Sequence, residues 1–150
     1  MKGQLTRRRL IQGFMSVVAL SAVPLQLLAR AKGAFEATQK DAVYKAVFGN
    51  LPIVESTDVK MKIPDIAENG AVVPVSVSTS IEGVEGIFVI IDNNPNPLSA
   101  SFHMGPYSAA DISVRVKMGK SSIVRGMVKT ADKVYMTSQE VKVTIGGCGG

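Results

Sequence analysis

Residues 73–78 read Val-Pro-Val-Ser-Val-Ser, and residues 112–118 read Ile-Ser-Val-Arg-Val-Lys-Met. In both segments every second residue is apolar, and the residues between are mostly polar. A strand with one face against a core and the other in water has this period of two. Both segments are therefore predicted to be half-buried β-strands.

Similar segments lie on both sides of these two. In residues 98–104 the apolar residues again alternate with polar ones, which places Leu98, Ala100, Phe102 and Met104 on one expected face. Further apolar stretches follow the same reasoning: 59–63, 86–91, 123–128 and 134–145. Gly, Asn and Pro separate them, so the chain is predicted to be mainly β, an immunoglobulin-like β-sandwich of about seven strands.

Before these strands, residues 40–48 have the spacing of a short helix. One helical face would carry four apolar residues: Ala42, Val43, Ala46 and Val47. Gly49 follows directly and suits a left-handed C-terminal cap.

The chain has 150 residues and a net charge of +5, with 17 basic and 12 acidic side chains. That length fits one domain. Five of the basic residues lie in residues 1–31, which contain no acid, so the remainder is neutral. A neutral body without Trp lacks both the phosphate contacts and the best stacking platforms of nucleic-acid binders, so no nucleic-acid partner is expected.

Residues 1–31 have a basic start, a diluted apolar run and Ala-Arg-Ala at the end, the layout of a cleaved export signal. Arg7 and Arg8 lie in a segment that resembles the twin-arginine signal. We expect export to the periplasm, with no membrane attachment after cleavage. An uncleaved anchor is the alternative, but the run is short for a spanning helix.

The sequence from 141 to 150 reads Val-Lys-Val-Thr-Ile-Gly-Gly-Cys-Gly-Gly and contains the only cysteine, Cys148. Val141, Val143 and Ile145 are expected to face the core, and alternation stops at Gly146. Glycine is the least restricted residue, so residues 146–150 are predicted to be a mobile tail. From Ile145 the cysteine could reach roughly 10 Å outward, at about 3.3 to 3.6 Å per residue.

Four segments together resemble the SoxY family, the sulfur-carrier subunit of the periplasmic thiosulfate-oxidising Sox system. They are the tail just quoted, "PDIAENGAVVPVSV" at 64–77, "DNNPNPLSASFHM" at 92–104 and "ISVRVKM" at 112–118. The resemblance extends over nearly all of the chain after residue 31. It implies an export signal at 1–31, a carrier domain at 32–145 and a swinging arm at 146–150.

The resemblance implies that Cys148 carries the substrate covalently and that Gly146, Gly147, Gly149 and Gly150 form its arm. A c-type cytochrome would couple thiosulfate to Cys148 as an S-thiosulfonate. A dimanganese thiosulfohydrolase would then release sulfate and leave a persulfide for sulfane-oxidising or sulfur-transferring enzymes. All of these would bind transiently, while a SoxZ-type subunit would form a heterodimer. The chain itself would be no enzyme and would hold no cofactor or metal.

Two other functions remain as alternatives. The chain could be a sulfur donor activated at the Gly150 carboxylate, as in diglycine-tailed carriers, although that activation needs ATP, which an exported protein lacks. It could also be an exported immunoglobulin-like interaction module whose tail has no role. Cys148 itself could instead form a disulfide-linked dimer.

The remaining polar candidates are interpreted as structural. His103 is the only histidine, so it lacks companions for catalysis or metal binding and is expected to be exposed. Asp65 and Glu68 are assigned to a solvated loop, and Asp92 to a rigid turn rather than a calcium site. Two further assignments complete the set: Met104 as core filler, and Arg115 with Lys117 on a solvated strand face that a partner could contact.

Overall fold

The computed structural model describes residues 32–144. The predicted export signal and the predicted arm lie outside the described residues, as does Ile145. The described elements in chain order are α2 (Lys32–Glu36), α3 (Lys40–Phe48), β1 (Ile53–Glu55), β2 (Val59–Lys62), β3 (Ile66–Ala67), β4 (Val73–Thr79), β5 (Gly86–Ile91), β6 (Leu98–His103), β7 (Asp111–Val116), β8 (Ser122–Lys129) and β9 (Val134–Val143).

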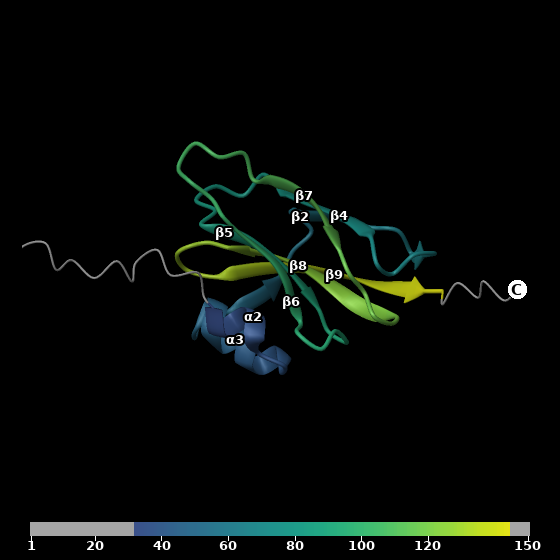
Figure 1. Cartoon of the computed structure of the whole chain (residues 1–150). Coiled ribbons are helices and arrows are strands. Elements are labelled where there is room, and N and C mark those ends of the chain that lie inside the picture. Colours follow the sequence, from purple (N-terminus) through teal and green to yellow (C-terminus); the bar gives the residue numbers. More distant parts are fainter. Residues whose placement is uncertain (1–31, 145–150) are drawn as a thin grey trace, which may run out of the picture. The chain divides into compact units, whose positions relative to one another are not determined.

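The strands form two sheets that pack face to face (Figure 1). The larger sheet has the order β1-β9-β8-β5-β6, and β3 also pairs with β9; the smaller sheet has the order β2-β4-β7. Helices α2 and α3 lie on the outer face of the larger sheet (Figure 1). The predicted immunoglobulin-like β-sandwich is confirmed, with a helical layer added to one side.

Seven of the nine described strands coincide with the seven predicted segments to within a few residues at their ends. The other two, β1 and β3, have three and two residues. Both pair in parallel with β9, β1 at its start and β3 at its end. Segments this short have no periodicity to detect, so the alternation could not predict them.

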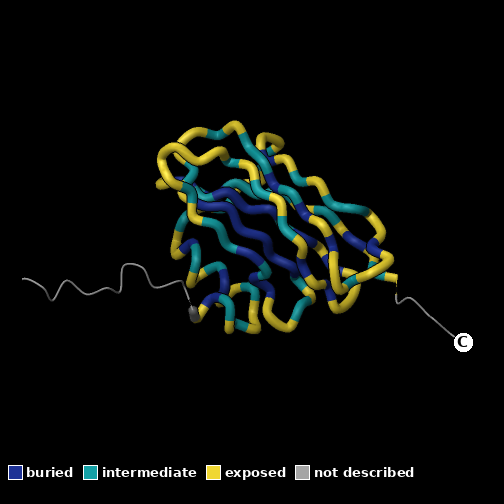
Figure 2. The backbone as a smooth tube through the Cα atoms, turned by 45° about the horizontal axis from the view of Figure 1, so that its top comes forward, coloured by how far each residue is buried: buried dark blue, intermediate teal, exposed yellow. Residues whose placement is uncertain are grey.

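The sandwich core lies between the two sheets and appears as the buried interior in Figure 2. Val73, Val75 and Val77 point into it from β4 and are fully buried, as the alternation predicted. Gly126 on β8 faces this layer, where an added Cβ would lie 3.1 Å from Val77 Cγ2. A larger residue at this point would therefore require Val77 to shift by a few tenths of an ångström.

Strand β5 is buried at all six positions. Its odd-numbered residues face the sandwich core and Phe88 and Ile90 face the helical layer. A strand covered on both faces has a continuous apolar sequence rather than an alternating one, and Gly-Ile-Phe-Val-Ile-Ile is such a sequence.

The expectation that Leu98, Ala100, Phe102 and Met104 share one face is wrong for Leu98. The register between β5 and β6 shifts between Val89 and Ile90, so that Val89 pairs with Ala100 and Ile90 with Leu98. Such a bulge rotates the strand by one residue. Leu98 therefore packs under the helices, while Ala100 contributes to the sandwich core.

Helix α3 occupies the predicted residues but buries a different face. Val43 and Phe48 are buried, Tyr44 and Val47 are partly buried, whereas Ala42 and Ala46 are exposed. The larger side chains remove more apolar area from water, so they determine which face packs. The ring of Phe48 meets that of Phe88 edge-on, with centroids 5.2 Å apart.

Gly49 ends α3, and its N–H donates to the carbonyl of Lys45 at 3.1 Å. Its φ of 63° is positive, as a glycine cap predicts, but its ψ of −121° lies outside the left-handed helical region. Glycine tolerates this combination because it has no Cβ. No helix within residues 32–144 combines the length and hydropathy needed to cross a membrane.

Candidate functional site

The predicted arm follows the end of β9, which makes that strand end the candidate site. In the antiparallel ladder, β8 begins at Ser122, opposite Val141. Strand β9 continues to Val143, two residues beyond its regular partner. The backbone at the end of β9 must therefore find other hydrogen-bond partners.

Strand β3 supplies partners on one edge of β9. The N–H of Lys142 donates to the Asp65 carbonyl at 2.9 Å, and the N–H of Thr144 donates to the Ala67 carbonyl at 3.1 Å. The Thr144 hydroxyl also points to the Ala67 carbonyl, at 3.5 Å. A strand of only two residues thus holds β9 up to the last described residue.

Ser121 supplies the partner on the opposite edge. Its Oγ accepts a hydrogen bond from the N–H of Val143 at 2.9 Å. Ser121 directly precedes β8, so its side chain continues the ladder where the backbone pairing has ended. No sequence pattern marks this role, because an exposed serine before a strand is ordinary turn composition.

The turn at 68–71 packs against the same strand end. Its Asn69 Oδ1 accepts from the N–H of Ala71 at 2.9 Å, and the Gly70 carbonyl accepts from the N–H of Met118 at 2.7 Å. A Cβ on Gly70 would collide with the Met118 carbonyl oxygen and lie 2.8 Å from Val143 Cγ1. Gly70 is therefore required for this close approach.

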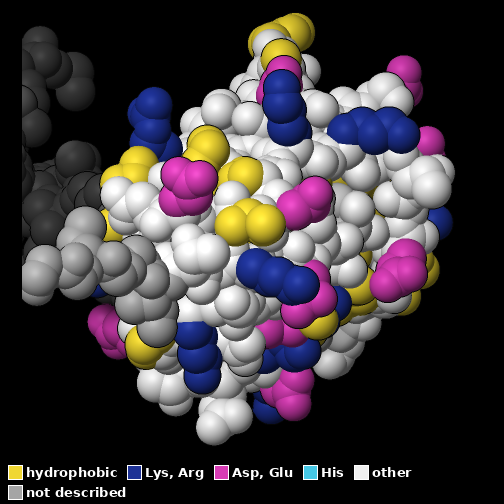
Figure 3. Space-filling model, turned by 90° about the vertical axis from the view of Figure 1, so that its right-hand side faces the viewer, with side chains coloured by type: hydrophobic (Ala, Val, Ile, Leu, Met, Phe, Trp, Pro, Cys, Tyr) yellow, Lys and Arg dark blue, Asp and Glu magenta, His cyan; other side chains and the backbone are white. Residues whose placement is uncertain are grey.

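An open groove of about 550 Å³ lies beside the strand end, lined by residues 68–71, 117–119, 143 and 144. Its charged residues, Glu68 and Lys117, have opposite signs. Figure 3 views the molecule from the end toward which β9 points, and acidic and basic side chains are intermixed there. This end thus has no single-sign field that would select for anionic or cationic partners.

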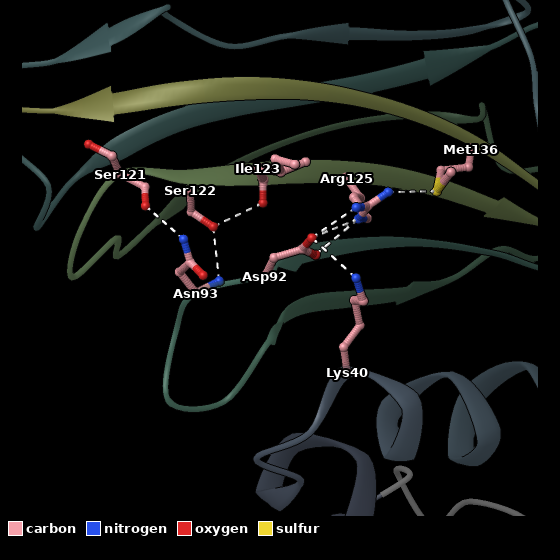
Figure 4. A network of polar contacts seen from close by, with 8 residues as sticks. All are labelled: Lys40, Asp92, Asn93, Ser121, Ser122, Ile123, Arg125 and Met136. Atoms are coloured by element: carbon pink, nitrogen blue, oxygen red, sulfur yellow. Dashed lines mark hydrogen bonds and ion pairs between the residues drawn. The ribbon is translucent and has the colours of Figure 1, made fainter.

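A second polar cluster, which no sequence pattern indicated, lies at the edge of the helical layer (Figure 4). The carboxylate of Asp92 accepts from Arg125 Nε at 2.9 Å and from Arg125 Nη2 at 2.8 Å. Lys40 Nζ, at the start of α3, lies 3.3 Å from the same carboxylate. Asp92 therefore joins the helix to the sheet.

Burial alone would raise the pKa of Asp92, but the hydrogen bonds and charge of Arg125, with those of Lys40, outweigh it and hold that pKa below its usual value. Burial raises the pKa of the neighbouring Tyr44; Arg125 opposes this rise, while Asp92 and Asp41 add to it. The Asp92 carboxylate is thus ionised at neutral pH, and its role is structural.

The two residues after Asp92 brace the turn that contains Ser121. Asn93 Nδ2 donates to the Ser121 carbonyl at 3.0 Å, and the Asn93 N–H donates to Ser122 Oγ at 2.9 Å (Figure 4). Asn94 Nδ2 donates to the Lys117 carbonyl at 2.7 Å. The prediction of a rigid turn at Asp92 is confirmed by these bonds.

Residues 44–148 match the family described as sulfur oxidation protein SoxY, about 70% of the chain. The chain belongs to the SoxY family. The solved structure of the sulfur carrier protein SoxY from Chlorobium limicola f thiosulfatophilum is 44% identical, with a TM-score of 0.64. The alignment covers 70% of this chain and 96% of that one. Membership in the sulfur-carrier family of the Sox system is therefore established.

A more distant likeness concerns the fold alone. The superoxide reductase (neelaredoxin) from Ignicoccus hospitalis is 14% identical, with a TM-score of 0.54 over 61% of this SoxY-family chain and 94% of the reductase. Comparison with curated protein sequences gives no match.

The residues predicted for the carrier arm and for the export signal all lie outside the described residues. These are Cys148, the four glycines Gly146, Gly147, Gly149 and Gly150, and the export-signal residues Arg7 and Arg8. The structure instead describes the strand from which the arm begins. The region matched to the SoxY family ends at Cys148 itself.

His103 is exposed, as expected, and its ring contacts that of Phe88. His103 pairs with Gly86 on β5. Gly86 pairs in turn with Lys129 on β8, and Lys129 pairs with Val134 on β9, so His103 and Val134 lie in the same row of the sheet. Val134 and Val141 are seven residues apart on β9, which is about 23 Å in an extended strand. His103 is thus far from the strand end that bears the arm.

The structure agrees with the predicted exposure of Asp65, Glu68, Arg115 and Lys117 and with the predicted core position of Met104. Asp65 and Glu68 are exposed, and Asp65 Oδ1 accepts from Gln139 Nε2 at 2.6 Å. Arg115 and Lys117 are exposed on and just beyond β7, and Met104 packs partly buried against the sandwich core. Within residues 32–144 there is no group of three or more potential metal ligands.

Proposed function

We propose that this chain carries sulfur covalently on Cys148 and presents it to separate enzymes of thiosulfate oxidation. The observation that carries the proposal is the family match, which runs through the described domain and ends at Cys148. It is supported by the glycine pairs on both sides of the cysteine and by the firmly bonded strand end from which they continue.

In the first step the Cys148 thiol and thiosulfate form a sulfur–sulfur bond. The products are an S-thiosulfonate, a proton and two electrons, and a c-type cytochrome accepts the electrons. In the second step a dimanganese thiosulfohydrolase adds water across the bond between the sulfane sulfur and the sulfonate. Sulfate and a proton leave, and Cys148 retains a persulfide. Sulfane-oxidising or sulfur-transferring enzymes then act on that sulfur.

The glycines explain why one thiol can serve several enzymes. Without a Cβ on either side of Cys148, the arm is slim enough for a narrow channel. Ordering its five residues costs about 1–2 kcal/mol each in backbone entropy. That penalty weakens every insertion, so each enzyme can release the carrier after its step.

The carrier is proposed to work in the periplasm as a heterodimer with a SoxZ-type subunit. Arg7 and Arg8 would direct export of the folded chain, which allows the partner subunit to travel with it. Replacing both arginines with lysine should leave the protein in the cytoplasm, as fractionation would show. Export of the doubly substituted chain at the normal rate would contradict this route.

The decisive variant is Cys148→Ser in a reconstituted thiosulfate-oxidising system. We expect complete loss of thiosulfate oxidation, because a hydroxyl cannot form the sulfur–sulfur bond. Intact mass of the wild-type carrier after incubation with thiosulfate should show reducible sulfur adducts on the C-terminal peptide. A wild-type carrier that oxidises thiosulfate without any adduct would contradict the proposal.

A relocated thiol provides the matched control. Tyr107 lies in the loop between β6 and β7 and is fully exposed. The double variant Tyr107→Cys with Cys148→Ser should react with an alkylating reagent yet remain inactive in thiosulfate oxidation. Activity of this variant would mean that any accessible thiol suffices and that the arm has no role.

A further inference from the structure

The geometry points to an anchor that fixes where the arm begins and thereby positions Cys148 for the partner enzymes. The anchor consists of the carbonyls of Asp65 and Ala67, the Ser121 hydroxyl, Gly70, and the strand end 142–144. Ser121 is a positioning residue in this scheme, since it acts on the arm through Val143. The inference rests on the proposed carrier role of Cys148.

The first support is that three consecutive N–H groups at the end of β9 are all bonded to the body. Lys142 and Thr144 donate to the carbonyls of Asp65 and Ala67 on one edge. Val143 donates to Ser121 on the other edge. Successive N–H groups of a strand point to opposite edges, so these bonds hold the strand from both sides. Movement of the strand end toward either side would break a bond.

The second support is that the Ser121 hydroxyl accepts from the N–H of Val143 at a position where β8 has no paired backbone carbonyl. Strand β8 pairs only as far as Val141, so Val143 would otherwise face the end of the sheet. Asn93 holds the main chain of Ser121 through its carbonyl at 3.0 Å. The main chain that carries the acceptor for Val143 is therefore held by contacts independent of β9.

The third support is steric. The side chain of Val143 packs partly buried against the sandwich core and lies against Gly70, whose own carbonyl is bonded to Met118. The strand end is thus held by packing on its face as well as by bonds at both edges.

A fixed origin sets the reach of the thiol. Four residues lead from Thr144 to Cys148, which allows about 13–14 Å of reach. Release of the three anchored residues would extend the tether to about 23–25 Å. Because effective concentration falls roughly as the −3/2 power of tether length, it would drop about twofold. The anchor therefore keeps the tether short. This raises the effective concentration of the thiol in each partner and limits how deep it can reach.

The anchor can be tested first without any partner enzyme, on the full-length chain. Amide hydrogen exchange of Val143 should be roughly fivefold faster in Ser121→Ala than in wild type, from the loss of one hydrogen bond. Ser108→Ala is the matched control, because Ser108 is an exposed serine whose Oγ accepts from the N–H of Gly105 at 3.0 Å. Unchanged exchange of Val143 in Ser121→Ala would overturn the anchor.

The positioning role is tested by compensation between the anchor and arm length. Deleting Gly147 shortens the arm by about 3.5 Å and should lower kcat of the reconstituted oxidation at least tenfold, with little change in the KM for the carrier. Releasing the anchor with Ser121→Ala and Thr144→Pro removes the hydroxyl acceptor of Val143 and the N–H donor of Thr144. In the deletion variant this release should restore at least half of the lost turnover.

A merely stabilising contact would not give this rescue, because two harmful changes would then add. Turnover that falls further in the combined variant would overturn the positioning role, even if exchange of Val143 has changed. Failure of the carrier proposal would look different. The wild-type chain would then form no sulfur adduct on Cys148, while the exchange measurement would still decide whether the anchor exists.

Discussion

The two ends of β9 are held by different kinds of interaction. At its start, Val134 is fully buried beneath the helices in an apolar cluster that includes Phe48 and Phe88. At its end, Lys142 and Thr144 are exposed, and hydrogen bonds to β3 and Ser121 hold the backbone. Apolar burial provides stability without direction, whereas hydrogen bonds fix direction at modest net stability. The start of β9 beneath the helices (the covered end) thus stabilises the domain, and its exposed end at 142–144 (the open end) is fixed in direction by hydrogen bonds.

The strongest test of this contrast is Phe88→Ala. Phe88 joins β5 to α3 and is buried, so its truncation should lower the free energy of unfolding by about 3–5 kcal/mol. Denaturant titration would measure the loss, with the fully exposed Tyr107→Ala as control. Alkylation of Cys148 in native buffer should keep its wild-type rate. A changed rate would show that the two ends are not independent.

A smaller decrease in the free energy of unfolding is expected from Asp92→Asn, which removes the negative charge that pairs with both Arg125 and Lys40. Hydrogen bonds to charged groups contribute more than neutral ones, so we expect about 2 kcal/mol. The exposed Asp111→Asn serves as the control. If the unfolding curves of wild type and Asp92→Asn coincide at neutral pH, the Asp92–Arg125 ion pair does not stabilise the covered end.

The same pair predicts how stability depends on pH. Because the folded-state pKa of Asp92 lies below its usual value, its ionised form stabilises the fold above the unfolded pKa of about 3.9. That contribution is lost as pH falls through the lower, folded-state pKa. The stability gap between wild type and Asp92→Asn should therefore narrow below about pH 4. A gap that widens with acid would contradict the assignment.

The smallest effect is expected at the open end, from Gln139→Ala. Gln139 Nε2 donates to Asp65 Oδ1 and, at 3.3 Å, to the Ile63 carbonyl, so it ties β9 to the segment that leads into β3. Its loss should cost about 1 kcal/mol and accelerate exchange of the Lys142 amide, which is bonded to Asp65. Gln39→Ala, just before α3, is the control. Faster amide exchange at Val134 rather than at Lys142 would show that Gln139 holds the start of β9 and not its end, which would contradict this prediction.

The strands were predictable wherever one face is buried. Alternation in β4 and β7 and the apolar sequence of β5 come directly from the layers that cover them. The bulge between Leu98 and Ala100 was not predictable, because a one-residue shift leaves the apolar spacing of β6 looking regular. On α3, the spacing allowed several faces, and only the packing of Phe48 against Phe88 selects one.

The chemistry of the candidate site stays a prediction from the sequence, and the geometry of the strand end was not predictable. Cys148 and its glycines are visible in the sequence because their composition is unusual there. Ser121 was not found, since its role depends on where β8 begins relative to the end of β9. The same holds for Asp92 and Arg125, which are 33 residues apart and meet only once β5 and β8 have paired.

The position of β9 inside the larger sheet has a consequence for biosynthesis. The strand lies between β8 on one side and β1 and β3 on the other, so the sheet cannot close until residue 143 has left the ribosome. A chain whose translation stops earlier lacks an internal strand and exposes the edges of its neighbours to proteolysis. A folded domain therefore requires a chain synthesised at least to residue 143, which is five residues before Cys148.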